Sequence, residues 1–253
     1  MIEKKIHYVW FGGAVPNHVM ENVAKWQELM PEWEIFFWNE KNLPNFEDDE
    51  YTQLIIKEKR YGYASDLLRY QLVNKFGGFY LDTDMVLLRS LDALRNQGTV
   101  IGFMYDNNLH TGMFGAEAGS DWIKKMIRVY TNPNEKLFYL TRDFSYTSNI
   151  IVTLATKEMF QSKFHLNGTT QIMDDGTLIL SKRFFVFPNY KVDGFSRHEF
   201  SNSWNDGKAY KGIRGKVKHL IRTIFGVQTM ENISAQVGKF RTTRMLKKLG
   251  VNK

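Results

Sequence analysis

Two carboxylates, Asp82 and Asp84, stand two residues apart after the apolar segment 79–81. If this segment is a β-strand that continues extended, side chains at i and i+2 project the same way, and both carboxylates face one site at the carboxyl end of the strand. Two hard oxygen ligands suit Mg²⁺ or Mn²⁺, and either ion also bridges the oxygens of a diphosphate. We therefore predict a site for a divalent cation that offsets the charge on a departing diphosphate.

Taken alone, this acid pair is a weak signal, because a chain of this length contains such pairs by chance. The context of the pair adds information. A Gly77-Gly78 turn precedes the aromatic strand, and the two acids follow at its end. Solvated surface carboxylates rarely have such surroundings, so the context favours a metal site.

A second pair, Asp66 and Arg69, lies in a segment with helical periodicity. The buried stripe of this helix is formed by Ala64, Leu67, Leu68 and Leu72. Asp66 and Arg69 fall together on a different face. They fit an ordinary i,i+3 ion pair worth about 0.5 kcal/mol or less, or a carboxylate and a guanidinium that hold sugar hydroxyls beside the metal. From residue type alone, the ion pair is the better interpretation.

Two further segments carry side chains that could bind a ligand or a metal ion. Trp10, at the end of the first predicted strand, either stacks on a nucleobase or fills the core. The segment 196–204 collects possible metal and phosphate ligands, among them His198. A single histidine in a loop is usually structural or solvated, so residue type alone does not select His198.

The elements that position these residues alternate between strand and helix. Apolar and aromatic runs predict strands at 6–11, 34–38, 79–82, 99–105 and 112–116, with 85–88 continuing extended. Helical periodicity predicts helices at 17–29, 51–76 (running through Gly62, with or without a break), 121–130 and 147–156. This order predicts an α/β fold with a largely parallel sheet covered by helices.

Length and composition limit the class of protein. The 253 residues, 43% hydrophobic, predict one α/β domain with a small appendage. The absence of cysteine excludes a disulfide framework or a thiolate metal site and fits a reducing cytoplasm. We find no secretory signal and no apolar run of the roughly 18 residues that a membrane span needs, so we expect a cytoplasmic protein, soluble or peripheral.

The C-terminal segment 208–253 differs from the rest in charge. It carries 12 Lys or Arg against the single acid Glu231, a charge of +11, which leaves about −4 for residues 1–207. We therefore divide the chain into a catalytic domain, 1–207, and a basic tail, 208–253. The apolar residues of the tail recur at helical spacing, so the tail either contacts an anionic membrane or docks on the body.

Three motifs together resemble a known family. They are 6–13 (IHYVWFGG), 64–70 (ASDLLRY) and 77–84 (GGFYLDTD), which occur in this order and spacing. They resemble the glycosyltransferases of family 32, which carry a DXD motif and include capsular polysaccharide and Och1-like enzymes. The glucosylating domains of large clostridial toxins are more distant relatives. The resemblance covers the first 90 or so residues well and the later chain mainly at Ser203-Trp204.

The resemblance implies a GT-A type, Rossmann-like fold and a retaining transfer from a nucleotide-sugar. By position, Trp10 would stack on the base, and Asp66 and Arg69 would hold the donor sugar. Asp82 would contact ribose or metal-bound water, and Asp84 would be the firmer metal ligand. The implied nucleotide-sugar site includes further residues of the motifs: Val9, Tyr63, Ser65, Thr83, Ser203 and Trp204.

The late motif of the family usually has paired histidines before Ser-Trp. Here the pair is His198-Glu199, so either residue could complete the shell of Mn²⁺ or Mg²⁺, and Trp204 would close over the diphosphate. UDP-hexose is the expected donor, with GDP-mannose as the alternative. The expected acceptor is a hydroxyl of a glycan or a lipid-linked saccharide in surface polysaccharide synthesis, reached from the inner face of the cell membrane. His110, Thr111 and Asn149 are candidates for the acceptor site.

Two other classes compete with this interpretation. A phosphatase of the haloacid dehalogenase class would use Asp82 and Asp84, with the pair Asp174-Asp175 as its late acids. Its motif normally lies near the N-terminus, whereas about 80 residues precede it here. A non-catalytic protein that binds nucleic acid would need aromatic residues interleaved with the tail's cations, and the tail has few of them. We therefore expect no nucleic-acid partner.

Overall fold

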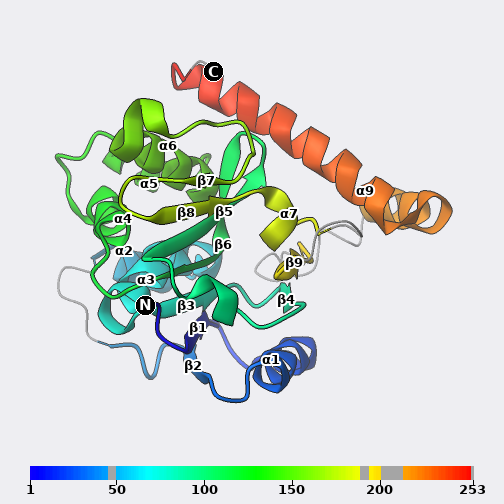
Figure 1. Ribbon diagram of the computed structural model, residues 1–253, viewed down its shortest axis with the longest axis horizontal. Coiled ribbons are helices and arrows are strands. Elements are labelled where there is room, and N and C mark those ends of the chain that lie inside the picture. The colour runs from blue at the N-terminus through cyan, green and yellow to red at the C-terminus, as the bar shows by residue number, and fades with distance from the viewer. Residues whose placement is uncertain (45–49, 189–193, 201–212, 252–253) are drawn as a thin grey trace.

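A seven-stranded sheet crosses the centre of the computed structural model (Figure 1), which describes residues 1–44, 50–188, 194–200 and 213–251, and side chains outside 213–228. The strands lie in the order β2-β1-β3-β6-β5-β8-β7. Within this sheet β6 and β7 run opposite to the other five strands. The predicted α/β fold with a mostly parallel sheet is therefore confirmed. The strands are β1 (Lys5–Val9), β2 (Glu34–Trp38), β3 (Gly78–Leu81), β5 (Thr99–Tyr105), β6 (Asn108–Ala116), β7 (Gln171–Ile172) and β8 (Thr177–Leu180).

Helices cover both faces of this sheet and enclose two apolar clusters. One cluster lies under α2 to α6, and the other packs α1 and α7 against the opposite face. The helices are α1 (Asn17–Leu29), α2 (Glu50–Lys57), α3 (Tyr61–Phe76), α4 (Asp121–Thr131), α5 (Phe138–Arg142), α6 (Ser148–Phe160), α7 (Lys182–Phe185) and α9 (Ile213–Lys248), with short 3₁₀ turns η1 (Asp92–Leu94) and η2 (Gln161–Lys163).

The Gly77-Gly78 turn sets the approach of α3 to β3. Both glycines have positive φ, +64° and +98°, a region that L side chains rarely adopt. A Cβ on Gly78 would also lie 2.6 Å from the carbonyl oxygen of Lys5 on the neighbouring strand β1. The turn therefore requires glycine, and it delivers Asp82 to the carboxyl end of a central strand.

The acid pair does not continue the strand, contrary to our expectation, whereas residues 85–87 are extended as predicted. Asp82–Asp84 form a turn, in which the Met85 N–H donates to the Asp82 carbonyl (3.0 Å). Side chains of α1 hold this turn, because Asn22 donates to the carbonyls of Thr83 and Met85. The chain then forms β4 (Met85–Leu87), which pairs antiparallel with β9 (Ser196–His198) in a separate small sheet. This pairing brings the late motif to the acid pair.

Helix α9 docks its C-terminal half on the turn between β5 and β6. In this turn Asp106 pairs with Lys182 (2.5 Å) and with Lys239 of α9 (2.9 Å), and Asn107 donates to the Thr243 hydroxyl (2.8 Å). Leu246 belongs to the apolar cluster under α2 to α6, and Ala235 belongs to the cluster beside α1 and α7. The N-terminal part of the helix extends beyond the body of the molecule (Figure 1). We expected the tail either to contact an anionic membrane or to dock on the body. The C-terminal half of α9 docks on the body.

The predicted elements otherwise differ from expectation only at their bounds, whereas the sequence predicted none of α5, α7, β7, β8 and β9. The predicted helix 51–76 is interrupted at Lys59, where φ is +57°, and forms α2 and α3. Strand β6 begins at Asn108, four residues before the predicted start.

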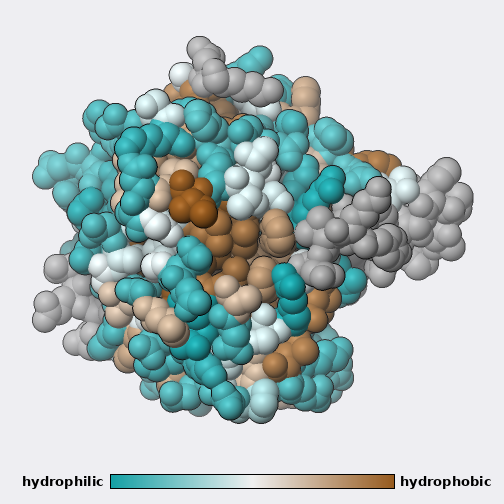
Figure 2. Space-filling model, viewed as in Figure 1, coloured by the Kyte–Doolittle hydropathy of each residue, from teal (hydrophilic) through white to brown (hydrophobic). Residues whose placement is uncertain are grey.

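Figure 2 shows the same face as Figure 1, mostly hydrophilic with a brown patch over β7 and β8, where Ile172 is exposed. No helix in the described ranges is both long and apolar enough to cross a bilayer.

Candidate functional site

A pocket of about 500 Å³ opens at the carboxyl ends of β1 and β3. This is the edge at which open α/β sheets bind ligands. The predicted residues Val9, Trp10, Tyr63, Ser65, Asp66, Arg69, Asp82, Thr83 and Asp84 all line it. The structure therefore brings the three N-terminal motifs to one pocket. The further lining residues are Phe11, Gly12, Tyr61, Gly62, Tyr80, Met104, His110, Thr111, Gly112, Thr147, Ser148, Asn149 and His198.

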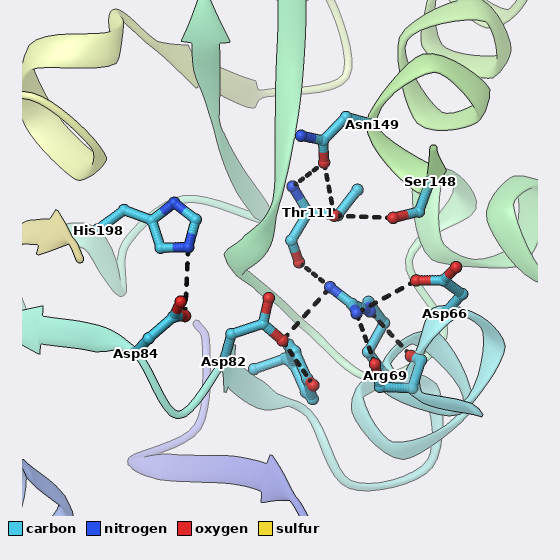
Figure 3. A network of polar contacts seen from close by, with 10 residues as sticks. Asp66, Arg69, Asp82, Asp84, Thr111, Ser148, Asn149 and His198 are labelled. Carbon is cyan, nitrogen blue, oxygen red and sulfur yellow. Dashed lines mark hydrogen bonds and ion pairs between the residues drawn. The ribbon is translucent and has the colours of Figure 1, made fainter. Parts of the chain in front are cut away.

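Arg69 is the centre of a buried hydrogen-bond network (Figure 3). Its guanidinium donates to the Thr111 carbonyl (2.6 Å), to the Ser65 carbonyl (2.8 Å) and hydroxyl (2.7 Å), and to Asp66 (3.3 Å). A carboxylate oxygen of Asp82 lies 3.6 Å from it. The sequence favoured an ordinary i,i+3 ion pair, and Asp66 and Arg69 do form one (3.3 Å). The pair is buried, however, and it is part of the pocket wall.

Asp66 is buried beside this guanidinium. Burial raises the pKa of Asp66 to about 6, and the attraction of Arg69 and a hydrogen bond with Ser148 offset this effect only in part. Near neutral pH the carboxylate is ionised and accepts hydrogen bonds. It can therefore bind the hydroxyl groups of a ligand, at a cost to folding stability.

Asp66→Asn should stabilise the fold increasingly as pH rises. The pKa in the folded state is raised from 3.8 to about 6, so the stability linked to the neutral carboxyl is complete below 3.8 and is lost as pH rises through 6. Asparagine cannot ionise and keeps that stability. The free energy of unfolding of the variant relative to wild type should rise by about 3 kcal/mol across this window. Urea unfolding at both ends of the window measures it, and a difference independent of pH would contradict the assignment.

Asp82 and Asp84 face different partners. Asp82 accepts a hydrogen bond from the Tyr80 hydroxyl (2.9 Å). Asp84 lies 3.2 Å from Nε2 of His198, the last residue of β9. Burial lowers the pKa of His198, but Asp84 more than offsets it, so the pKa of His198 is raised. The two acids line one pocket because of the turn at Thr83 and not, as we expected, because of strand periodicity.

His110 completes this side of the pocket from β6. Its ring lies 5.0 Å from that of His198. A Cβ on Gly112 would lie 2.7 Å from a carboxylate oxygen of Asp82 and 2.9 Å from the His110 ring. Burial, followed by the proximity of His198, lowers the pKa of His110 well below its usual value. The sequence suggested an acceptor-site role for His110 and gave no signal for its place beside the acid pair.

Thr111 and Asn149 form the opposite wall. The Asn149 side chain, near the start of α6, accepts hydrogen bonds from the backbone N–H (3.1 Å) and hydroxyl (2.7 Å) of Thr111. Ser148 lies 3.2 Å from the same hydroxyl (Figure 3). These groups fix the strand whose carbonyl accepts from Arg69. Thr111 and Asn149, two of the three candidates for the acceptor site, therefore line the pocket and also support the network around Arg69.

A divalent cation fits the chemistry of the Asp84–His198 pair. A carboxylate suits Mn²⁺ and a neutral imidazole is a common metal ligand. Among the described residues, the buried Nδ1 atoms of His110 and His198 have no hydrogen-bond partner. Within the described ranges, no three or more His, Cys, Asp or Glu side chains form a complete metal site. Cations of this kind are often held by one or two carboxylates plus the phosphates of the substrate. The pair could therefore hold part of a shell that a diphosphate completes.

The remaining predicted residues lie outside this pocket or outside the described ranges. Glu199 is exposed, ion-pairs with Arg197 (3.4 Å) and does not line the pocket, so His198 is better placed than Glu199 as a metal ligand. Ser203 and Trp204 fall in 201–212, which the structure does not describe. Asp174 and Asp175 lie between β7 and β8, three strands and more from β3, so they do not supply the late acids of a phosphatase.

Comparison with known families confirms the resemblance that the motifs predicted. Residues 16–101 match the family described as "Glycosyltransferase sugar-binding region containing DXD motif". This stretch contains Asp66, Arg69, Asp82 and Asp84. A solved structure, "PaToxG Glycosyltransferase", superposes with a TM-score of 0.50 over 62% of this chain and 70% of that chain, at 14% identity. At this identity the likeness concerns the fold alone, and it confirms the GT-A type.

Two yeast proteins are among the similar sequences. "Mannosyl phosphorylinositol ceramide synthase SUR1" of Saccharomyces cerevisiae is 29% identical over 89% of this chain and 59% of its own length. "Inositol phosphoceramide mannosyltransferase 3" of Schizosaccharomyces pombe is 24% identical over 50% of this chain and 36% of its own length. The chain thus matches less than two thirds of either relative.

Proposed function

We propose that this chain, which carries the sugar-binding region of DXD glycosyltransferases, is a metal-dependent hexosyltransferase that uses a nucleotide-sugar. One observation carries the proposal: the Asp66–Arg69 pair and the Asp82–Asp84 pair, from different elements, line the same pocket at the carboxyl edge of the sheet. Their buried hydrogen bonds hold the first pair rigidly, as transfer chemistry requires of groups that position a substrate.

Each side of the pocket has its own task in this proposal. Trp10, half-buried at the mouth, stacks on the nucleobase. Asp66 accepts hydrogen bonds from hydroxyls of the donor sugar, and Arg69 holds Asp66 and Asp82 in place. Asp84 and His198 would hold Mn²⁺ or Mg²⁺, and such an ion would offset negative charge on the leaving diphosphate.

The transfer retains the anomeric configuration by displacement on one face of the sugar. The acceptor hydroxyl attacks the anomeric carbon, the bond to the diphosphate breaks, and a departing phosphate oxygen takes the proton of the hydroxyl. Burial lowers the pKa of His110, so this residue stays neutral and adds no positive charge that would repel the metal ion. Isolation of a covalent glycosyl-enzyme would show that a carboxylate attacks first and would overturn this mechanism.

The donor is a hexose linked to UDP or GDP. The motifs favour a UDP-hexose, whereas both yeast relatives have names that describe mannose transfer, which supports GDP-mannose. The acceptor is a hydroxyl of a glycan or of a lipid-linked saccharide, in surface polysaccharide synthesis. The names of the two relatives refer to ceramide lipids, which adds support for an acceptor at a membrane. An acceptor attached to a membrane lipid would also account for the basic tail and would place the protein peripherally at the inner, cytoplasmic face.

Calorimetric titration of the protein with UDP-glucose, UDP-galactose and GDP-mannose, each with and without Mn²⁺, tests the proposal. We expect one donor to bind, with an affinity that falls at least tenfold (about 1.4 kcal/mol) when Mn²⁺ is omitted. Binding of that donor should be followed by slow hydrolysis to the nucleoside diphosphate. Release of phosphate from simple phosphoesters, with no binding of any nucleotide-sugar, would reverse the conclusion.

A further inference from the structure

The outward face of α9 exposes large apolar side chains. Ile233, Val237 and Phe240 are 42%, 46% and 64% exposed, and their i, i+4, i+7 spacing places them on one stripe of the helix. The opposite side of the helix, with Ala235 and Thr242, is buried against the body. Helix α9 therefore has apolar residues on both the docked side and the free side.

Cations continue the same stripe toward the C-terminus. Arg244 follows Phe240 by four residues, and Lys247 and Lys248 lie one turn further on. All three are exposed, and none forms an ion pair within the part of the chain that the structure describes. Glu231 is the sole acidic residue from position 208 onward in the sequence. The free face thus combines a protruding apolar ridge with positive charge.

The turn that holds α9 adjoins the pocket. The turn that holds α9 through Asp106 and Asn107 lies between Met104 and His110, and both of these residues line the pocket. Three polar contacts of this turn with Lys239 and Thr243 fix the helix on the body. A surface bound by α9 would therefore lie at a set orientation to the pocket.

We propose that the outward face of α9 binds the surface of an anionic lipid bilayer. The helix lies in the plane of the interface, with Val237 and Phe240 inserted among the acyl chains and Arg244, Lys247 and Lys248 against the anionic headgroups. Apolar burial and charge attraction act together, a combination that gives stable peripheral binding where either alone is marginal. The inference concerns a surface distinct from the pocket and does not depend on the reaction proposed above.

Vesicle co-sedimentation tests the inference with two variants of exposed residues. Deletion of α9 would uncover the apolar clusters that Ala235 and Leu246 close, so point substitutions are sharper. V237S/F240S should weaken binding to vesicles of phosphatidylcholine mixed with phosphatidylglycerol by tenfold or more. R244Q/K247Q/K248Q should weaken it by about 100-fold, because each of the three cations near such a surface contributes about fivefold. Pure phosphatidylcholine vesicles should bind wild type weakly.

The matched control is M20S/K25Q, which makes the same kinds of change at exposed positions of α1. It should bind vesicles as wild type does, and all variants should unfold at the same temperature. Equal binding of wild type to neutral and anionic vesicles, or unchanged binding by both α9 variants, would overturn the inference. So would a wild-type dimer that V237S/F240S dissociates, or binding of RNA in place of vesicles. Nucleotide-sugar binding in the same samples reports on the pocket separately.

Discussion

Asp84→Asn should reduce the rate of glycosyl transfer by about 10³-fold or more while leaving the fold intact. The substitution keeps the shape of the side chain but removes the charged oxygen that faces His198 at 3.2 Å. A metal ion contributes several kcal/mol to a transition state with developing charge, and each 1.36 kcal/mol corresponds to a tenfold change in rate. Steady-state measurement of kcat/KM with the donor identified by calorimetry checks the result.

Two variants make this expectation specific. Asp174→Asn, at an exposed carboxylate paired with Lys163, should leave the rate unchanged and separates the loss from a general effect of charge. His198→Ala should raise the Mn²⁺ concentration needed for half-maximal activity, because a ligand of the ion is lost, whereas Glu199→Gln should change kcat/KM by no more than about threefold. The assignment of Asp84 fails if Asp84→Asn retains wild-type activity at saturating Mn²⁺. The choice of His198 fails if Glu199→Gln has the larger effect.

Arg69→Ala should destabilise the fold by about 3–5 kcal/mol and abolish donor binding. The guanidinium forms four hydrogen bonds and lies 3.6 Å from Asp82 in a buried site, and loss of one partner of a buried ion pair leaves an uncompensated charge. For a chain of this size, the melting temperature should fall by roughly 10 °C. Thermal unfolding and donor titration measure the two effects separately.

Comparison variants show that the effect comes from the buried network. Arg69→Lys keeps the charge but cannot reproduce the planar fork that reaches Thr111 and Ser65 together, so it should also lose stability. Arg128→Ala, at an exposed arginine paired with Glu135, should change stability by less than about 1 kcal/mol. Combining Arg69→Ala with Asp66→Asn should recover part of the loss, because the unpaired carboxylate is then absent. Strictly additive losses would show that Asp66 and Arg69 do not interact.

The sequence by itself determined most elements of residues 1–160 and most of the candidate residues. Periodicity gave α1, β2 and β5 with their observed bounds, because each has an uninterrupted apolar pattern of one period. The Gly77-Gly78 pair predicted the turn into β3, since few residues other than glycine adopt positive φ. The three motifs predicted the family, and they predicted Asp66, Arg69, Asp82 and Asp84 as site residues.

Only the tertiary structure decided how those residues meet. Burial of Asp66 and Arg69 depends on the helices that cover α3, and no local pattern distinguishes a buried i,i+3 pair from an exposed one. The pairing of β4 with β9, which brings His198 to Asp84, joins segments more than 100 residues apart, and strand register over such a distance is set by packing. His110 lies near the acid pair for a similar reason. Its strand β6 pairs with β3, the strand that ends just before Asp82, and this pairing is also set by packing.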